Sequence, residues 1–559
     1  MSTELTFIEK TLQKCKQTLG ILFLFSFAIN FFSLAVPLYS LQIFDRVLSS
    51  GSFETLTMLT IIVLITVIIL GLLQNIRAYI LMKMGSWIDT SVSGDCLSVS
   101  VNKLAHQESM SGSQPLRDLA TIKGFVSGQV LQQLFDAPWA IIFFIVIFLI
   151  HPIMGTICLL AGFVLLGLAI LNEKQTKGPL QKANELSAKN MQLAESITQN
   201  SEVIKSMGML SKIMMSWQNS NQKTSQEQLK AYQKSNMYGS IARSIRLVIQ
   251  MITTGASAYL VLTHKMSPGG IVAISILSGK ALAPFDASIN TWKSTLTVQK
   301  AFSRLKELMN HMPKEEEYFD YQEIEGDISL DKLYYMAPGT KKPIIKGIQA
   351  TIQSGDIVGL VGPSGSGKST LIKLMVGILE PSSGVVRFDN VDIKQWDKSK
   401  LGNFLGYLPQ EVELFQGSVK DNIARMDTSV DDKDVIDSAQ IAGAHDVILS
   451  LSNGYKTQVG NQGTNLSAGQ RQRVGLARAF FHQAKIIVLD EPNAHLDQEG
   501  EAALLKSLDY AKQKGVTVII VSHRPTILSK VDKLMILLDG QIQKYGPTKE
   551  VAPTIMKAS

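Results

Sequence analysis

A short run of small residues, "VGPSGSGKST" at residues 361–370, has the spacing of a loop that grips phosphate. An apolar stretch typical of a strand precedes it, and "TLIKLMVGIL", with the pattern of a helix, follows it. Glycines let backbone N–H groups curl around phosphate oxygens, Lys368 would meet the β- and γ-oxygens, and Ser369 would offer its hydroxyl to Mg²⁺. The residues predicted to contact ATP are Gly362, Pro363, Ser364, Gly365, Ser366, Gly367, Lys368, Ser369 and Thr370.

An acidic pair ends a second apolar run, "AKIIVLDEP", about 120 residues further on. Asp490 would stand at the tip of a buried strand beside the phosphate loop, where Mg²⁺ needs a carboxylate. Glu491 would orient the water that attacks the γ-phosphate, or accept its proton. A carboxylate after a strand is often structural, but its place after a phosphate loop favours catalysis. Together the two motifs predict an α/β ATPase.

Between these two motifs lies "NLSAGQRQR" at residues 465–473, which resembles the signature sequence of ABC transporters. Three further segments resemble motifs of that family and keep its order along the chain. Gln410 in "YLPQ" resembles the Q-loop, "NAHLD" at residues 493–497 the D-loop, and His523 in "IIVSHR" the switch histidine. Five motifs in one order are far more specific than any one of them.

The resemblance implies that the site is shared between two chains. In ABC proteins two nucleotide domains pair head to tail, and each ATP lies between one phosphate loop and the signature of the other domain. Ser467, Gly469 and Gln470 would then contact the partner's nucleotide. One chain carries one such domain, so a homodimer is the simplest complete transporter.

The resemblance also implies which residues act on the bound nucleotide. ATP and Mg²⁺ are the expected cofactors. The implied catalytic residues are Glu491, His523 and Gln410. The residues that would surround Mg²⁺ are Ser369, Gln410 and Asp490.

Three positions depart from the ABC pattern. Ala468 stands in the signature where Gly is more common. Ala337 stands where many exporters carry an aromatic residue that stacks on adenine, so Tyr335 or Tyr334 would have to replace it. Asn461, in "TQVGNQG", stands where the exporter coupling loop usually has Glu. We expect these changes to affect adenine binding and communication with the membrane part.

The composition is that of a membrane protein. Of 559 residues, 46% are hydrophobic and only 18% are charged, and the mean hydropathy is +0.15. The net charge of +7 fits the Lys and Arg that flank membrane spans. Nucleic-acid binding is not expected, because no compact basic motif with interleaved aromatic residues is present. The three cysteines lie far apart, which predicts neither a structural disulfide nor a zinc site.

Apolar runs predict six membrane-spanning helices, since about 20 apolar residues cross a bilayer, and all of these runs except the last are free of charged residues. The predicted spans fall at residues 17–44, 55–76, 137–172 (two helices), 247–263 and 271–289. We expect "DRVLSSGSFE" to form a short external link after the first span. His151 and Pro152 divide the double-length run, so His151 is interpreted as a turn residue.

Two charged residues, Lys280 and Asp286, fall within the last predicted span. They are costly in lipid, so they should face the transport path or form an ion pair, either with each other or across subunits. Long polar stretches at residues 77–136 and 173–246 are rich in Lys, which places them in the cytoplasm by the positive-inside rule. The nucleotide-binding domain is therefore expected in the cytoplasm as well.

The membrane half resembles the type I secretion ATPases that export proteases and lipases. "VPLYSLQIFDRVLSSGSFETLTMLT" looks like their first external hairpin, and residues 116–152, 201–210 and 267–284 are also similar to that group. The resemblance covers nearly the whole chain. One difference is Lys280, where Arg is commoner.

Membership of that group would imply an ATPase of the bacterial inner membrane, surrounded by lipid. Its partners would be a periplasmic membrane-fusion adaptor, an outer-membrane channel and an unfolded secreted protein with a C-terminal signal. The first span begins almost at once, so neither an N-terminal peptidase domain nor a full accessory domain is expected. The alternative is a lipid or drug half-exporter, which shares the ATP motifs and six spans. A soluble P-loop ATPase acting on DNA would lack the spans.

The expected architecture is a membrane α-helical domain of six spans, of the type I ABC exporter kind, fused to an α/β P-loop nucleotide-binding domain. A short cytoplasmic N-terminus would occupy residues 1–18, and the transmembrane domain with its long cytoplasmic helices residues 19–307. A charged linker at residues 308–325 would lead to the ABC ATPase domain at residues 326–559.

Overall fold

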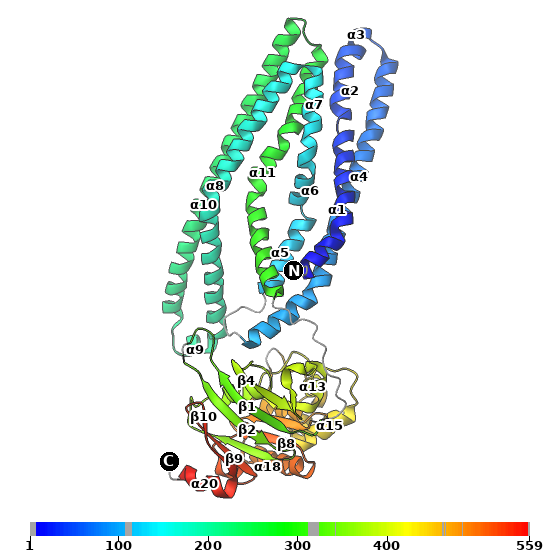
Figure 1. Cartoon of the computed structure of the whole chain (residues 1–559). Helices are drawn as coiled ribbons and strands as arrows, with labels where there is room; N and C mark the ends of the chain where they lie inside the picture. Colours follow the sequence, from blue (N-terminus) through cyan, green and yellow to red (C-terminus); the bar gives the residue numbers. More distant parts are fainter. Residues whose placement is uncertain are drawn as a thin grey trace. The chain divides into compact units, whose positions relative to one another are not determined.

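The computed structural model describes residues 7–106, 114–310, 324–340, 342–460, 463, 465–482 and 484–556. The chain divides into two compact units, a helical unit with the helices α1 to α11 and an α/β unit with the strands β1 to β10 (Figure 1). Most of the predicted linker lies outside the described residues. The predicted domain boundaries therefore stay predictions.

The helical unit is built from a few very long helices and several short ones. α8 and α10 lie side by side along much of their length (Figure 1). The elements are α1 (Phe7–Phe32), α2 (Ala35–Gln42), the π-helix η1 (Ile43–Val47), α3 (Leu48–Ser50), α4 (Phe53–His106), α5 (Gln114–Ser127), α6 (Gln129–Asp136), the 3₁₀-helix η2 (Ala137–Trp139), α7 (Ala140–Ile150), α8 (Pro152–Gln199), α9 (Ser201–Ser206), α10 (Leu210–Leu262) and α11 (Pro268–Met309).

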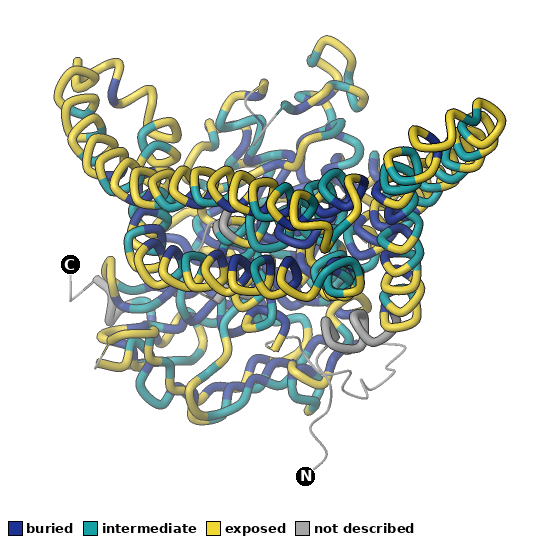
Figure 2. Tube along the Cα trace, turned by 90° about the horizontal axis from the view of Figure 1, so that it is seen from above, coloured by how far each residue is buried: buried dark blue, intermediate teal, exposed yellow. Residues whose placement is uncertain are grey.

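Six helical segments of the described chain are long and apolar enough to cross a membrane, which confirms the predicted number. They are Cys15–Ser50, Phe53–Asn102, Gln129–Ile150, Pro152–Gln199, Leu210–Leu262 and Pro268–Ser288. In the most apolar stretch of the second segment none of the residues is buried inside the protein. Exposed residues follow the outer sides of the long helices (Figure 2). So large an apolar surface needs lipid to cover it.

The break between α7 and α8 lies where the sequence predicts it. α7 ends at Ile150, and α8 begins at Pro152. His151 is the N-cap of α8, and its Nδ1 accepts a hydrogen bond from the backbone N–H of Ile153 at 3.2 Å. Its role is that of a turn residue, because this bond satisfies an N–H group that the helix itself leaves without a partner.

The first external link is shorter than predicted. Helical structure continues through η1 and α3 as far as Ser50, so most of the expected link is helical. Only Gly51 and Ser52 separate α3 from α4. Gly51 has a φ of +66°, a left-handed conformation that ends a helix and that glycine adopts without strain.

Of the alternatives for Lys280 and Asp286, an ion pair with each other is not what the structure has. Asp286 of α11 instead pairs with Arg246 of α10, with 2.6 Å between Oδ2 and Nη1. The ammonium of Lys280 lies 5.9 Å from the ring centroid of Phe143. Lys280 and Asp286 are six residues apart on α11, which corresponds to a rotation of about 240° around the helix axis after one full turn. The two side chains therefore lie on different faces of α11. Whether either residue lines a transport path stays a prediction.

A second polar contact joins the hairpin after the first span to the turn before the last span. The carboxylate of Asp45, in η1, accepts hydrogen bonds from the hydroxyl of Ser267 at 2.5 Å and from the backbone N–H of Gly269 at 2.7 Å. Asp45 thereby caps the start of α11 from a distant part of the chain. A Cβ on Gly269 would lie 2.5 Å from the carbonyl oxygen of Leu41, so the turn has room only for glycine.

The α/β unit contains two sheets. The four-stranded sheet has the order β2-β1-β4-β5 and the six-stranded sheet the order β10-β9-β3-β8-β7-β6. The strands are β1 (Ile328–Tyr335), β2 (Ile345–Ile352), β3 (Ile357–Val361), β4 (Ser383–Phe388), β5 (Val391–Asp392), β6 (Leu405–Leu408), β7 (Ile486–Asp490), β8 (Thr517–Val521), β9 (Lys533–Leu538) and β10 (Gln541–Pro547).

Helices and turns connect these strands. In the six-stranded sheet, β9, β3, β8, β7 and β6 run parallel, and β10 is antiparallel to β9. The connecting elements are α12 (Lys368–Met375), η3 (Ile393–Gln395), α13 (Lys398–Phe404), α14 (Val419–Ile423), α15 (Asp432–Ile441), α16 (His445–Leu449), η4 (Gly454–Lys456), α17 (Ala468–Ala479), α18 (Gln498–Gln513), α19 (Pro525–Leu528) and α20 (Thr548–Met556).

The core of the α/β unit lies on both faces of the six-stranded sheet. β3, β7 and β8 are buried at every residue, as parallel strands covered on both faces must be. Ile487 and Leu489 of β7 enter one apolar cluster with residues of α17 and α18. Ile486 and Val488 enter a second cluster with α12 and with strands of the other sheet. Alternate residues of one strand therefore hold the two layers together.

One close approach in β6 generates a test of this packing. A Cβ on Gly406 would lie 2.0 Å from the carbonyl oxygen of Ala479, at the end of α17. We expect Gly406→Ala to destabilise the α/β unit by about 1–3 kcal/mol, because the strand and the helix would have to separate. The measurement is the thermal unfolding midpoint of the purified full chain. Gly402→Ala in α13, where a Cβ meets nothing within 4 Å, is the control, and an equal loss in both variants would contradict the argument.

Candidate functional site

The phosphate loop joins β3 to α12 and has little room for larger residues. Gly365 and Gly367 have φ angles of +80° and +100°, which favour glycine. A Cβ on Gly362 would lie 2.2 Å from the carbonyl oxygen of Leu537. The predicted residues 362–370 thus form a tight turn that ends in the first turn of α12, with the N-terminal N–H groups of that helix beside it.

Lys368 folds back over the loop that precedes it. Its ammonium donates hydrogen bonds to the carbonyl oxygens of Gly362 at 2.7 Å and Pro363 at 3.0 Å. The side chain is buried, and this burial lowers the pKa of the ammonium, while the charges of Glu491 and Asp490 oppose the shift. Because carbonyl groups carry no net charge, a phosphate oxygen would be a stronger partner for this ammonium.

Ser369 and Asp490 come together beside the loop. Asp490 ends β7, is only 3% exposed, and pairs with Val521 of β8. Burial raises the pKa of its carboxyl, and the hydrogen bond from the hydroxyl of Ser369 opposes that shift. The described residues contain no group of three or more His, Cys, Asp or Glu side chains that could hold a metal ion. One buried carboxylate and one hydroxyl fit Mg²⁺, which usually takes few protein oxygens and completes its shell with phosphates and water.

Gln410 and Glu491 meet at the neighbouring strand ends. The amide Nε2 of Gln410, two residues beyond β6, donates to Oε2 of Glu491 at 3.3 Å. Glu491 has a φ of +49°, and its backbone N–H donates to the carbonyl oxygen of Val521 at 3.2 Å. A left-handed conformation is strained in a residue with a Cβ, so the surrounding hydrogen bonds must hold this carboxylate in place.

The end of β8 carries the predicted switch residue. His523 is exposed and lies two residues beyond Val521, the β8 partner of Asp490. Next to it, the hydroxyl of Ser522 donates to Oδ1 of Asn493 at 3.1 Å and accepts from the backbone N–H of Arg524. The predicted D-loop is thereby tied to the switch segment.

The predicted signature residues lie at the start of α17. Ser467 caps this helix: its Oγ accepts from the backbone N–H of Gln470 at 3.2 Å, and the Gln470 side chain accepts from the N–H of Ser467 at 2.8 Å. Ser467 is exposed. α17 packs against α14, α15 and β6, whereas α12 packs against β7. The structure therefore groups Lys368 with the strand-end carboxylates, and it leaves Ser467 on a separate, exposed surface.

The residues that were connected with the departures from the ABC pattern differ in burial and in place. Tyr335 is partly buried against the second apolar cluster, and it pairs with Ile345, which lies against Gly367 of the phosphate loop. Tyr334 is 45% exposed. Ala337 is half-buried in the turn that follows β1, and Asn461 lies outside the described residues.

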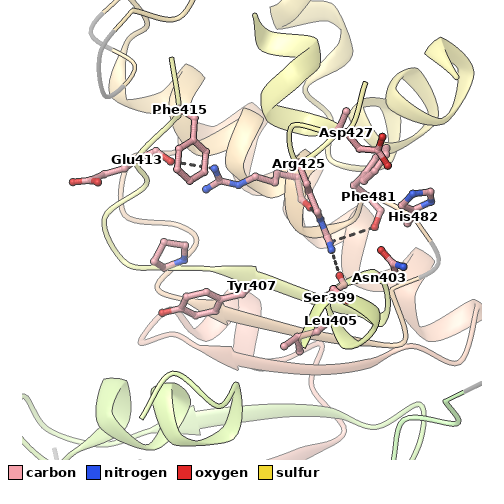
Figure 3. Close-up of a pocket in the computed structure, with 14 residues that line it drawn as sticks. Ser399, Asn403, Leu405, Tyr407, Glu413, Phe415, Arg425, Asp427, Phe481 and His482 are labelled. Atoms are coloured by element: carbon pink, nitrogen blue, oxygen red, sulfur yellow. Dashed lines mark hydrogen bonds between the residues drawn. The ribbon is translucent and has the colours of Figure 1, made fainter. Parts of the chain in front are cut away.

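A cavity of about 540 Å³ lies beside β6, and the sequence did not predict it (Figure 3). Arg425 reaches into its wall and donates hydrogen bonds to the carbonyl oxygens of Arg478, Phe481 and Gly402. Burial lowers the pKa of Arg425 to about 10, and the nearby Arg478 adds to that shift.

The other side of this cavity is partly apolar and open. Arg478 lies 5.9 Å from the ring centroid of Phe415, which is 62% exposed. Burial raises the pKa of Tyr407 to about 12, and the charge of Asp490 adds to the shift. Tyr407 lies on β6, which pairs with β7, the strand that ends at Asp490. Two residues that line the cavity, Arg425 and His482, have left-handed φ angles of +53° and +64°. No sequence motif marks either position.

The fold and the site define an ABC transporter. Residues 19–283 match the family model for the ABC transporter transmembrane region, and residues 345–494 match that for ABC transporters. The solved structure of a bacterial Atm1-family ABC exporter with ATP bound has a TM-score of 0.82, at 18% sequence identity over 97% of this chain and 96% of that one. The predicted fold class is confirmed.

Relatives narrow the class further. The type I secretion system ATP-binding protein PrsD of Rhizobium meliloti (strain 1021) is 34% identical over 95% of this chain and 91% of that protein. The toxin RTX-I translocation ATP-binding protein of Actinobacillus pleuropneumoniae and the leukotoxin translocation ATP-binding protein LktB of Mannheimia haemolytica are each 29% identical, over 94% of this chain and 75% of their own lengths. The chain belongs to the type I secretion ATP-binding proteins within the ABC transporter family.

Family membership confirms three of the expectations from the sequence. The chain is an ATP-binding, ATP-hydrolysing transporter, it is a multi-pass membrane protein, and it serves protein export together with other secretion components. The six candidate spans exclude the interpretation as a soluble P-loop ATPase acting on DNA. The roles of individual residues are not part of this identification and stay predictions.

The adenine contact generates a second test. Ala337→Tyr should tighten ATP binding by about tenfold, because an aromatic ring that stacks on a base contributes about 1–3 kcal/mol. The measurement is the Kd for ATP, with Ala337→Leu as the control for added bulk. Tyr334→Ala should change the Kd little. A large loss in Tyr334→Ala, with no gain in Ala337→Tyr, would show that Tyr334 already stacks on adenine.

Proposed function

We propose that this chain uses ATP to export an unfolded polypeptide across the inner membrane of a bacterium. The observation that carries the proposal is the meeting of Lys368, Ser369, Asp490, Gln410 and Glu491 at one sheet edge, in a chain that also has six candidate spans. The polypeptide cargo follows from similarity to the secretion relatives along nearly the whole chain. The excess of Lys in the long polar helices favours a cytoplasmic position for them and for the ATPase unit.

Two copies of the chain would form the working unit. Ser467 is exposed at the start of α17, where it can meet a second chain. In a head-to-tail pair, Ser467, Gly469 and Gln470 of one chain would contact ATP held by residues 362–370 of the other. ATP would then hold the two nucleotide domains together, and its hydrolysis would release them.

Within each site we assign separate tasks to the strand-end residues. Lys368 would bind the β- and γ-phosphates, and His523 would contact the γ-phosphate. Glu491 would take the proton of the attacking water, and the amide of Gln410 would keep its carboxylate oriented. Ser369, Gln410 and Asp490 would hold Mg²⁺, which when bound neutralises charge on the phosphate oxygens.

The remaining partners lie outside this chain. A periplasmic membrane-fusion adaptor and an outer-membrane channel would continue the path, and the cargo would be a secreted protein with a C-terminal signal. The support for these partners is the family resemblance of the membrane half. The alternative cargo is a lipid or a drug, since a half-exporter of that kind would have the same ATP site.

The assignment of Glu491 predicts a variant that binds but does not turn over. Glu491→Gln should keep the Kd for ATP within about threefold and lower kcat by about 10²–10⁴-fold, because the amide cannot accept a proton. ATP binding and steady-state hydrolysis by the full chain are the measurements. Glu499→Gln, at an exposed position in α18, should hydrolyse ATP normally. Near-normal hydrolysis by Glu491→Gln would exclude Glu491 as the base.

The proposed partners predict the result of a co-purification. Whole envelopes carrying this chain would be cross-linked in an ATP-trapped and in a nucleotide-free state, with the Glu491→Gln variant as the trap. Recovery of a periplasmic adaptor and a secreted protein with the chain is the expected outcome. Recovery of the homodimer with bound lipid alone, in both states, would favour the lipid or drug half-exporter.

A further inference from the structure

A basic cavity of about 370 Å³ lies in the helical unit, between α8 and α11. We propose that it binds an acidic stretch of the exported polypeptide, an inference that rests on the proposed function. The residues that line it are Lys177, Gln181, Leu296, Gln299, Lys300, Ser303 and Arg304. This lining contains three cations, two amides and a hydroxyl, and it contains no carboxylate. It is called the basic cavity below.

The lysines of the basic cavity have no charge partner of their own. Among the described residues, neither Lys177 nor Lys300 forms an ion pair or a side-chain hydrogen bond. Arg304 is different, because its Nε and Nη2 donate to the two carboxylate oxygens of Asp118 at 2.8 and 2.6 Å. Asp118 therefore fixes one wall, and the charges of the two lysines remain available to a ligand.

Another cavity of the helical unit shares part of the wall of the basic cavity and extends its polar surface. Its volume is about 540 Å³, and Lys300 and Arg304 line both cavities. It adds the cations Arg117 and Lys189 and the carboxylates Glu185 and Glu195. The added charges balance, so the excess of positive charge lies at Lys177 and Lys300.

The depth of the cavity favours a polypeptide over a lipid headgroup. The last span predicted from the sequence ends at residue 289, and Lys300 lies eleven residues further along α11, or about 17 Å at a rise of 1.5 Å per residue. The headgroup layer extends only about 5–8 Å beyond the hydrocarbon. Lys177, five residues beyond the charge-free run that ends at Asn172, lies about 8 Å beyond it. A headgroup could thus reach Lys177 but not Lys300.

The side-chain types suit a ligand of variable sequence. A lysine ammonium is a compact charge on a flexible stem, and it imposes less geometry on a carboxylate than the planar guanidinium of arginine does. The amides of Gln181 and Gln299 can donate to a carboxylate or accept from a backbone N–H. An extended chain with spaced Asp and Glu residues can use these groups without one fixed register.

Binding of a labelled peptide tests the proposal. The probe is a fluorescent, unstructured Gly/Ser peptide with several Asp residues, and its matched control has Asn in place of each Asp. Binding to the full chain in phosphatidylcholine nanodiscs would be followed by anisotropy. We expect the Asp peptide to bind more tightly than the Asn peptide, and to lose affinity as salt is added, because salt screens charge pairs.

Variants locate the binding to the basic cavity. Lys177→Gln combined with Lys300→Gln should weaken binding of the Asp peptide by about tenfold, and each single change should account for part of that loss. Lys174→Gln combined with Lys234→Gln is the control, because it removes the same charge from exposed residues that line neither cavity. ATP hydrolysis without peptide should be equal in all variants.

Each other outcome overturns the proposal. Equal binding of the Asp and Asn peptides, or equal loss in the cavity and control variants, would exclude an acidic ligand at this place. Competition by phosphatidylglycerol in the nanodiscs, with an effect of Lys177→Gln alone, would assign the site to a lipid headgroup. The proposed function fails separately, if no polypeptide of any charge binds the chain while lipid stimulates its ATP hydrolysis.

Discussion

The nucleotide site depends on the parallel order of four strands. Parallel strands end at the same edge of a sheet, so β3, β8, β7 and β6 deliver the residues that follow them to one place. The phosphate loop follows β3, and Gln410 follows β6. Asp490 is the last residue of β7, and Glu491 comes directly after it. The apolar residues of these strands fix the sheet, and the polar residues beyond them are positioned as a result.

The buried charged groups at this edge of the sheet favour ligands of high charge. The ammonium of Lys368 and the carboxyl of Asp490 are both desolvated, and in each case burial shifts the pKa toward the neutral form. Phosphate oxygens beside the ammonium and a divalent cation beside the carboxylate would restore the lost solvation. The buried guanidinium of Arg425 is stabilised differently, because three backbone carbonyl oxygens accept its hydrogen bonds. The first arrangement suits a site that fills and empties, and the second suits a permanent wall.

The sequence predicts the parts of this structure that follow from local patterns. The apolar runs predict six spans, and the structure has six candidate spans. The phosphate loop lies between a strand and a helix, as its pattern predicts. Contacts between residues far apart in the chain could not be predicted in the same way. Asp286 pairs with Arg246 rather than Lys280, because the rotation of α11 decides which face each side chain occupies.

The cavities show the same limit. Their walls combine residues from several elements, and no spacing in the chain connects Lys177 with Lys300, or Arg425 with Arg478. Helix length was also underestimated at the first external link, where a π-helix and a further turn carry the helical path to Gly51. A sequence pattern marks where polar residues interrupt a span, but the φ angle of one glycine decided where the chain reversed.

The cap that Asp45 places on α11 has a consequence for biosynthesis. The carboxylate of Asp45 accepts a hydrogen bond from the N–H of Gly269, 224 residues further along the chain. Most of the membrane unit is therefore synthesised between these two residues. The contact can form only after the turn that precedes the last span has been synthesised and has come to lie beside the first hairpin. The hydrogen bonds of Asp45 in the first hairpin therefore form only once Ser267 and Gly269 of the last hairpin are present. Any chain that is stopped before residue 269 lacks this contact and differs from the finished protein at the first hairpin.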